Sequence, residues 1–268
     1  MRNGHSFGSA GAASSTSGYE RGRMTFSEGV RVRAEDYLRA FDRLVVVAPH
    51  PDDDVLGCGG SLAAAAAAGL DVAVVYVTDG SASHIGSPAY PPERLRDVRE
   101  CEARAALAIL GVQRKPRFLR IADGTVASLG PDQAEAIVAA IDETIGEAGH
   151  PLVMGPWIRD FHADHLAVAA LVRRASSRRP AATLLEYAVW LEEAGSQRDR
   201  PAFEEATPVT LDVRHHTASK VAALAVHRSQ LGELITDARS SFVLPPGLVG
   251  STAGPNERFL KVRLSAEA

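Results

Sequence analysis

The most informative segment of the chain is Leu44-Val45-Val46-Val47-Ala48-Pro49-His50-Pro51-Asp52-Asp53-Asp54. Its first half is apolar and mostly β-branched, which is typical of a buried strand in a parallel sheet. Its second half places a histidine and three carboxylates at the carboxyl end of that strand, where open α/β sheets bind their ligands. Three adjacent aspartates repel one another, and a bound cation is the simplest way to offset that repulsion. The other interpretation is an acidic loop in water, and this stretch alone does not decide between the two.

A second cluster far along the chain favours the metal interpretation: Asp160-Phe161-His162-Ala163-Asp164-His165. His162 and His165 are three residues apart, so they can share a face in the first turn of a helix. The carboxylate of Asp164 can accept a hydrogen bond from the ring N–H of one imidazole and so orient that ring, as carboxylates next to metal-binding histidines do. A single histidine is more often a packing or surface residue than a metal ligand. That interpretation is weaker for two closely spaced histidines flanked by aspartates. Together the two clusters supply two histidines and an aspartate for a catalytic zinc site, which leaves a fourth position open for water.

The rest of the chain alternates between strand and helix patterns. We expect strands over residues 71–78, 118–121, 152–155, 183–190 and 207–213, and helices over residues 34–43, 92–110, 131–147 and 220–234. A loop is expected at 245–247, where two prolines precede a glycine. This alternation predicts an α/β fold, namely a Rossmann-like, mostly parallel sheet with helices on both faces in a single domain.

Residues 1–30 differ from residues 31–268, which we expect to form the domain. They are rich in Gly, Ser, Ala and Thr without a periodic apolar face, which predicts a disordered tail. This tail lacks the apolar core of a secretory signal, and no apolar stretch approaches the roughly 20 residues that span a bilayer. The two cysteines, Cys58 and Cys101, form no close-spaced motif, and we interpret them as reduced small hydrophobic residues of a cytoplasmic protein.

The composition is that of a soluble globular chain with 46% hydrophobic residues. Its 268 residues suffice for one large domain with a good core. The net charge of −4 argues against a nucleic acid or an anionic membrane surface as the main partner. The oligomeric state is not indicated.

The run Gly57-Cys58-Gly59-Gly60 suggests a dinucleotide-binding loop, but the pattern fails. Leu62 stands where the third glycine is needed, and the Pro/Asp run separates the glycines from the strand. We expect these glycines to let an Ala-rich helix approach the strand closely. Neither a Walker lysine motif nor a nucleophile-elbow serine motif is present in the sequence.

On these motifs the chain resembles the zinc-dependent de-N-acetylases of the GlcNAc-phosphatidylinositol deacetylase family, also called LmbE-like. The family motif Pro-His-Pro-Asp-Asp-Glu appears as residues 49–54, and His-Pro-Asp-His appears as residues 162–165. The similarity continues through residues 78–80, 99–102, 110–112, 123–124, 220–230 and 257–259, and so covers most of residues 43–260. There are two departures: Asp54 replaces the family's Glu, and Ala163 replaces its Pro.

The resemblance implies a hydrolase that removes an N-acetyl or other N-acyl group from an amino sugar or a GlcNAc-containing conjugate. It implies that His50, Asp53 and His165 hold Zn²⁺, which lowers the pKa of a water molecule to roughly 7 and polarises the acetyl carbonyl. Fe²⁺ and Co²⁺ also suit such a ligand set. Asp52, next to a ligand, has the position of the family's general base.

Further roles are expected for residues near this site. His162, one helical turn from His165, would be protonated and stabilise the developing oxyanion, and Asp164 would hold it in that state. Arg99 and Asp123 match family positions that contact the substrate. Trp157, close before the second cluster, is the aromatic residue expected to form a pocket wall.

Three polar residues later in the chain are interpreted differently. Lys220, His227 and Gln230 are spaced by seven and three, so they can share one face of the expected helix 220–234. We interpret them as half-buried packing residues with polar tips rather than as catalytic groups.

Two other functions remain open at this point. The first is an amidase acting on a non-sugar or on a thiol-sugar conjugate, and the loop over residues 81–92 would decide that choice. The second is a non-catalytic metal-binding or sugar-binding protein. The presence of both Asp52 and His162 counts against it, because binding alone needs neither.

Overall fold

An eight-stranded sheet forms the centre of the computed structural model, which describes residues 30–147, 149–202 and 205–264. From one edge to the other the strands are β1 (Val30–Arg33), β8 (Ala206–Asp212), β10 (Asn256–Val262), β7 (Thr183–Tyr187), β6 (Pro151–Pro156), β2 (Arg43–Ala48), β3 (Asp71–Thr78) and β5 (Arg117–Ile121). Only β10 is antiparallel to its neighbours, β7 and β8, within this described sheet. The expected mostly parallel sheet is therefore confirmed.

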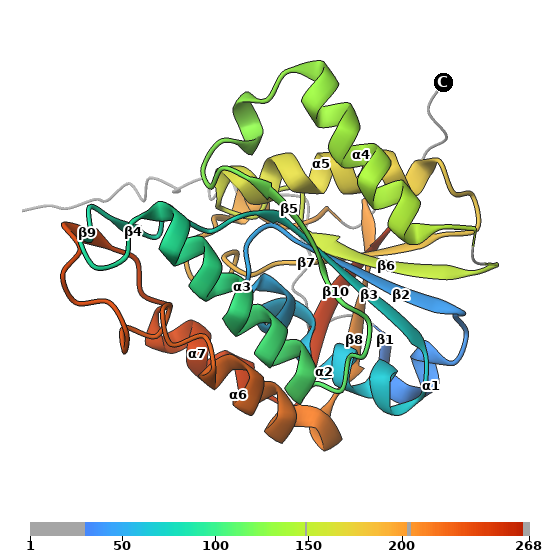
Figure 1. The fold of residues 1–268 in the computed structure, drawn as a ribbon. Coiled ribbons are helices and arrows are strands. Elements are labelled where there is room, and N and C mark those ends of the chain that lie inside the picture. Colours follow the sequence, from blue (N-terminus) through green and yellow to red (C-terminus); the bar gives the residue numbers. More distant parts are fainter. Residues whose placement is uncertain (1–29, 148, 203–204, 265–268) are drawn as a thin grey trace, which may run out of the picture.

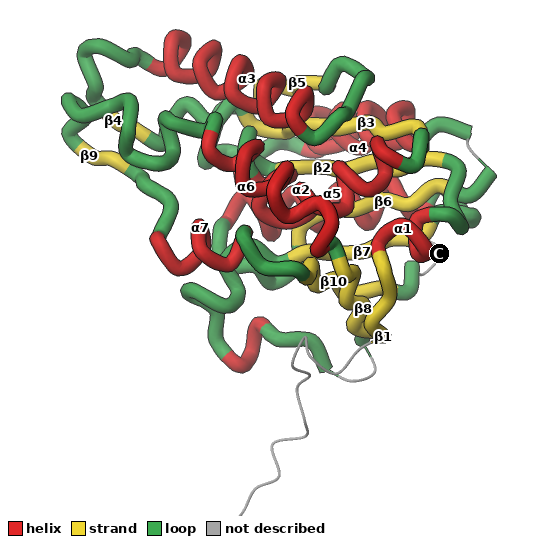
Figure 2. Tube along the Cα trace, turned by 90° about the horizontal axis from the view of Figure 1, so that it is seen from below, coloured by secondary structure: helices red, strands yellow, loops and turns green. Residues whose placement is uncertain are grey.

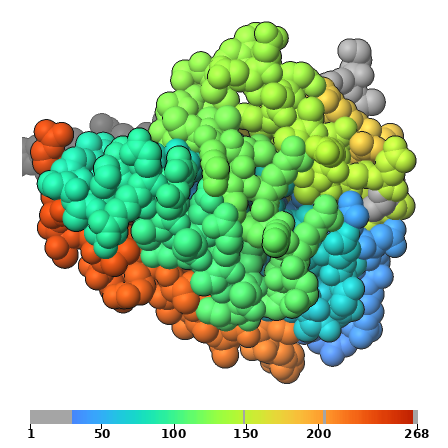
Figure 3. All heavy atoms as spheres, viewed as in Figure 1, coloured from blue at the N-terminus to red at the C-terminus, as the bar shows by residue number. Residues whose placement is uncertain are grey.

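Helices cover both faces of the sheet (Figure 1). One face carries α1 (Ala34–Leu38), α2 (Asp53–Ala67), α3 (Pro92–Ile109), α6 (Thr217–Ala225) and α7 (Pro246–Thr252), and the other carries α4 (Pro131–Ile145) and α5 (Ala163–Ser177). Figure 3 looks onto the side where the teal α3 and the yellow-green α4 flank the edge strand β5. Short 3₁₀ turns lie at Val126–Ser128, Gln197–Asp199 and Arg214–His216.

The central strand β2 is buried on both faces, which explains its continuous apolar run. Leu44 and Val46 pack into the core beneath α2, α3 and α6, whereas Val45 and Val47 pack into the core beneath α4 and α5. Successive side chains of a strand point to opposite faces, so two covered faces require apolar residues at every position.

The strand order reverses at β2, and this reversal determines where along the edge of the sheet the ligand site lies. From β2 the chain adds β3 and β5 on one side, and then β6 and β7 on the other (Figure 2). The carboxyl ends of parallel strands lie at one edge, and a crevice forms there where the order reverses. The segments that follow β2 and β6 therefore meet.

Some elements differ from the sequence-based expectations. The prediction of a helix over residues 220–234 is wrong beyond Ala225, where α6 ends. Turns follow, and in the first of them His227 N donates a hydrogen bond to Leu224 O. The expected loop at 245–247 contains the start of α7, because proline is tolerated in the first helical turn. Strands β1 and β10 were not expected. The predicted tail lies outside the described residues except for Val30, where β1 begins.

The glycines of α2 allow close packing, but their near neighbours lie at the end of β7 and after β8 rather than on β2, the strand that we expected the helix to approach. A Cβ atom at Gly57 would overlap the ring of Tyr187, and one at Gly60 would lie 2.6 Å from Val213 Cβ. Tyr187 cannot move away freely, since its hydroxyl donates to Val47 O at 2.8 Å.

Replacing Gly57 with alanine is expected to lower the free energy of unfolding by about 1–3 kcal/mol, because an overpacked core shifts side chains or backbone. Chemical denaturation of the parent and variant would measure this. The control is Gly250→Ala in α7, where a Cβ atom meets nothing within 4 Å. Equal losses in the two variants would contradict the steric explanation.

Both cysteines are free in the described structure, but only Cys58 is a buried small hydrophobic residue, while Cys101 is exposed. The described residues include no helix that combines the length and the apolar character required to cross a bilayer.

Candidate active site

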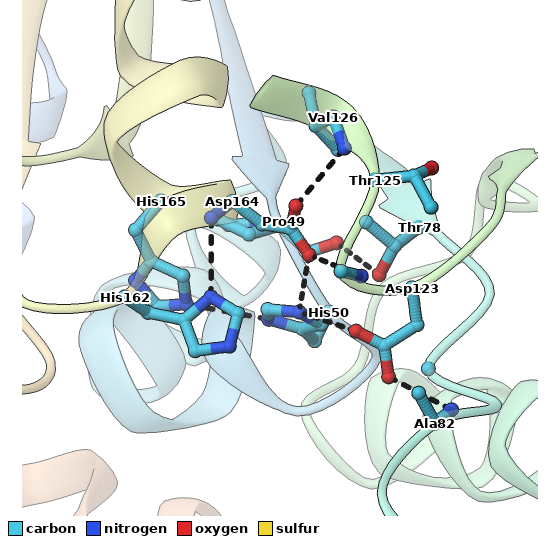
Figure 4. Close-up of polar contacts among 12 residues, drawn as sticks. Pro49, His50, Thr78, Ala82, Asp123, Thr125, Val126, His162, Asp164 and His165 are labelled. Carbon is cyan, nitrogen blue, oxygen red and sulfur yellow. Dashed lines mark hydrogen bonds and ion pairs between the residues drawn. The ribbon is translucent and has the colours of Figure 1, made fainter. Parts of the chain in front are cut away.

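The two sequence clusters meet at the carboxyl-terminal edge of the sheet. His50 and Asp52 lie in the tight turn between β2 and α2, and Asp53 is the first residue of α2. His162 and His165 lie at the start of α5. The turn is tied down because Pro49 O accepts hydrogen bonds from the backbone N (2.9 Å) and the side chain (2.8 Å) of Thr78. Figure 4 shows the imidazoles of His50, His162 and His165 beside one another.

Three donor atoms converge on one point. His50 Nδ1 lies 3.1 Å from Asp53 Oδ2 and 3.3 Å from His165 Nε2. Asp53 Oδ2 in turn lies 3.1 Å from His165 Nε2. Donor atoms about 2.0–2.1 Å from a tetrahedral zinc ion stand about 3.3 Å apart, so these separations fit such an ion. The residues that we expected to bind metal therefore have compatible donor types and spacing.

Other donors surround these three. Two overlapping groups in the described residues bring three ligand atoms within 4.8 Å of one another: His50 with His162 and His165, and His50 with Asp123 and Asp164. The cluster of histidines and aspartates can therefore hold a metal ion.

Opposite charges shift the pKa values within the cluster. Burial by itself favours the neutral form of each group. The pKa of Asp53 is nevertheless held below its usual range, because His165 and His50 surround the carboxylate. Burial also lowers the pKa of His165, but the charges and hydrogen bonds of Asp53 and Asp160 raise it overall to about 9. Without a metal ion, His165 therefore carries a proton at neutral pH, and a metal has to displace it.

Carboxylates behind the histidines orient their rings. Asp160 Oδ2 lies 2.8 Å from His165 Nδ1, so the ring donates there and turns Nε2 toward Asp53. On the other ring, His50 Nε2 lies 3.1 Å from Asp123 Oδ1 and 3.3 Å from Asp164 Oδ2. These contacts leave Nδ1 of His50 facing Asp53.

The side chain of Asp164 does not hold His162 as we expected. Its carboxylate accepts hydrogen bonds from Gly124 N (2.7 Å) and Val126 N (3.1 Å) and contacts His50 instead. Only the backbone N of Asp164 reaches His162, donating to Nδ1 at 3.2 Å. The loop after β5 captures the carboxylate, and the sequence pattern around residue 164 does not reveal that loop.

His162 is also not held in its protonated form. Burial lowers its pKa, and the neighbouring charges of His50 and His165 lower it further. Because Nδ1 accepts a hydrogen bond from Asp164 N, the proton of the neutral ring lies on Nε2. His162 can thus donate a hydrogen bond while uncharged.

Asp52 lies beside the three donors and is 4% exposed. Its Oδ1 atom is 3.1 Å from the guanidinium of Arg99, which also donates to Gly80 O at 2.9 Å. Burial raises the pKa of Asp52, Arg99 opposes this effect and Asp53 adds to it. A carboxylate with a raised pKa is a better proton acceptor than an ordinary one.

These groups line one cavity of about 250 Å³. Its polar side comprises His50, Asp52, Asp53, Arg99, Asp123 and His162, and its apolar side comprises Leu56, Trp190, Phe242 and Leu244. Arg99 and Asp123 are therefore brought to the site, as expected. Trp157 is not, because it is fully buried in the core against α5 and donates to Asp199 O at 2.7 Å.

Sequence reasoning missed several residues of this region. Asp160 is the partner of His165, and its place in the second cluster was the available signal. Gln230 lines the cavity, and its Oε1 atom is buried without a partner in the described part of the chain. Lys220 and His227 are fully buried rather than half-buried: Lys220 pairs with Glu257 at 2.7 Å, and burial lowers the pKa of His227 to about 3.

Asp54 is not part of the cavity. It lies in the first turn of α2 and is fully buried, and its Oδ2 atom accepts a hydrogen bond from the hydroxyl of Tyr76 at 2.8 Å. Burial raises the pKa of Asp54 to about 7. This shorter replacement for the expected glutamate therefore belongs to the core.

Comparison with known proteins adds independent findings. The sequence profile described as GlcNAc-PI de-N-acetylase (PIG-L) matches residues 45–176. The chain is 31% identical over 278 residues to 1D-myo-inositol 2-acetamido-2-deoxy-alpha-D-glucopyranoside deacetylase of Actinosynnema mirum, covering 86% of this chain and 95% of the relative. It is 27% identical over 241 residues to 2'-N-acetylparomamine deacetylase of Streptomyces fradiae, covering 79% and 83%. The solved structure of teicoplanin deacetylase Orf2 shares the fold with a TM-score of 0.62 and 22% identity, covering 84% of this chain and 100% of that one.

Proposed function

Because the chain belongs to the GlcNAc-PI de-N-acetylase (PIG-L) family, we propose that it removes the N-acetyl group from an amino-sugar conjugate by metal-assisted hydrolysis. The observation that carries this proposal is the convergence of His50 Nδ1, Asp53 Oδ2 and the buried His165 Nε2 next to the cavity that His50, Asp52 and Asp53 line. The named activities of the relatives on acetylated amino sugars support the substrate class.

Under this proposal His50, Asp53 and His165 hold the metal ion, which fits Zn²⁺ and equally Fe²⁺ or Co²⁺. When bound, such an ion supplies Lewis-acid polarisation of the acetyl carbonyl and makes a water molecule more acidic. Asp160 keeps His165 in the ligating orientation, and Asp123 and Asp164 do the same for His50.

Asp52 acts as the general base. It accepts a proton as the water oxygen bonds to the acetyl carbon, and it returns a proton to the nitrogen when the C–N bond breaks. The products are acetate and the free amine. Arg99 holds Oδ1 of Asp52 and so fixes the direction in which the carboxylate faces.

His162 stabilises the oxyanion that develops on the acetyl oxygen. Its Nε2–H donates a hydrogen bond in the neutral state, so this role does not need the imidazolium form that the sequence suggested. The polar lining residues of the cavity face the sugar.

A direct test measures acetate release by the metal-loaded protein from a panel of N-acetylated compounds. The panel should include glucosaminides, a thiol-sugar conjugate and non-sugar amides. Release from glucosaminides is the expected result. Release only from non-sugar amides would point to the amidase function, and no release from any compound would point to a binding protein.

Metal binding is expected to release at least one proton at pH 7. The pKa of His165 is raised to about 9, so the metal-free residue is protonated there and must lose its proton to bind. Affinity should therefore rise with pH between 7 and 9, by up to about tenfold per unit, as the proton competes less. Calorimetric titration with Zn²⁺ in two buffers of different ionisation enthalpy gives the number of protons. The same heat in both buffers would contradict the prediction.

A further inference from the structure

The apolar lining of the cavity includes one aromatic side chain that is partly open to solvent. Phe242 lines the cavity and is 37% exposed. Trp190, Leu56 and Leu244 are the other large apolar residues of the lining. Apolar surface that is exposed beside polar groups marks binding sites in proteins.

Phe242 is held in place by a small arm of the structure. The arm pairs β4 (His84–Ile85) with β9 (Ser240–Ser241) in an antiparallel sheet at one end of the molecule (Figures 1 and 2). Phe242 N donates to Ser83 O at 2.8 Å, and Leu244 N donates to Gln230 O at 2.8 Å. These bonds, one at Phe242 itself and one two residues later, fix its position relative to the cavity.

The apolar wall continues inward from Phe242 to the metal cluster. The rings of Trp190 and Phe242 lie 5.6 Å apart in an edge-to-face arrangement. Trp190 N donates to Asp160 Oδ1 at 2.8 Å, and the other oxygen of the same carboxylate accepts from His165. The carboxylate of Asp160 thus orients the ring of His165 and also holds the backbone of Trp190 in the apolar wall.

The size of the cavity limits what it can enclose. Its volume of about 250 Å³ lies below the range of about 300–1,000 Å³ that is common for sites enclosing a whole small ligand. A sugar joined to a second group therefore extends past the mouth. Phe242, the partly exposed aromatic residue of the lining, is the side chain available to contact that second group.

We infer that the group joined to the amino sugar is apolar, an aryl or alkyl aglycone, and that Phe242 is the residue that selects it. This inference rests on the proposed function for the sugar part of the ligand. The acetylated nitrogen points to the polar side of the cavity, and the aglycone packs on the wall formed by Trp190 and Phe242. A polar aglycone such as a cyclitol would leave this apolar surface in water.

The test compares the binding of phenyl and methyl β-D-glucosaminide, which carry no acetyl group and cannot be hydrolysed by the proposed reaction. Binding to the metal-loaded protein is followed by tryptophan fluorescence, since Trp190 lies in the cavity and Trp157 is buried in the core. We expect the phenyl compound to bind about fivefold to tenfold more tightly, the ratio that one good aromatic contact provides. Phe242→Ser should remove most of that difference.

The control is Ile109→Ser, an exposed apolar side chain at the end of α3 that does not line the cavity. This variant should keep the difference. Equal binding of the two compounds to the parent would overturn the inference, as would a preference that survives in Phe242→Ser. A Phe242→Ser variant that changes only the oligomeric state would also overturn it, because a second copy of the chain would then cover this surface.

Acetate release from the N-acetylated forms of the phenyl and methyl glucosaminides tests the proposed function separately from this inference. Equal release from both, with equal binding, leaves the deacetylase function standing and overturns the inference. Selective, Phe242-dependent binding without any acetate release supports the inference and counts against the deacetylase function.

Discussion

Replacing Asp52 with asparagine is expected to lower kcat by about 10²–10⁴-fold, the usual contribution of a general base. Asparagine keeps the shape of the side chain and an oxygen that can accept from Arg99, which lies 3.1 Å from Oδ1. It cannot accept the proton of the attacking water. The metal should stay bound, because Asp53 rather than Asp52 contacts both histidines.

To check this prediction, kcat and metal content are measured on the same preparation of the parent and of Asp52→Asn. Asp132→Asn, in the exposed first turn of α4, is the matched control for loss of one carboxylate and should retain the parent rate. A fall of less than about tenfold in Asp52→Asn with full metal content would assign the base to another group.

Replacing His165 with alanine is expected to weaken metal binding by more than about 100-fold. Changes to groups that only orient a ligand cost 10–100-fold, so loss of the ligand itself should cost more. His165 is fully buried and its Nε2 atom faces both His50 and Asp53, so its loss removes one of the three converging donors. Activity should fall with the metal.

Thermal unfolding gives a readout of this prediction that does not depend on activity. An ion that binds only the folded state raises Tm, so added Zn²⁺ should raise the Tm of the parent and leave that of His165→Ala nearly unchanged. His215→Ala, at an exposed histidine, should respond like the parent. A His165→Ala protein that retains stoichiometric metal with parental affinity would remove His165 from the ligand set.

Local sequence was enough to predict the central strand and the donor residues at its end. A continuous apolar run from Leu44 to Ala48 can be buried at every position only where both faces of the sheet are covered by helices. It therefore predicts an inner strand of a parallel sheet. His50 and Asp53 follow it within a few residues, so local spacing alone places them at the carboxyl end of β2. The spacing of His162 and His165 likewise indicated a helix start, and α5 begins at Ala163.

The contacts between residues far apart in the sequence depend on how the strands and loops pack together. Asp164 contacts His50 rather than His162, because the loop after β5 holds its carboxylate through Gly124 N and Val126 N. Trp190 rather than Trp157 lines the cavity, although Trp157 is nearer to the second cluster in sequence. Periodicity reports the face on which a residue lies within its own helix or strand, but contacts between elements follow from the strand order and the loops, which no local pattern encodes.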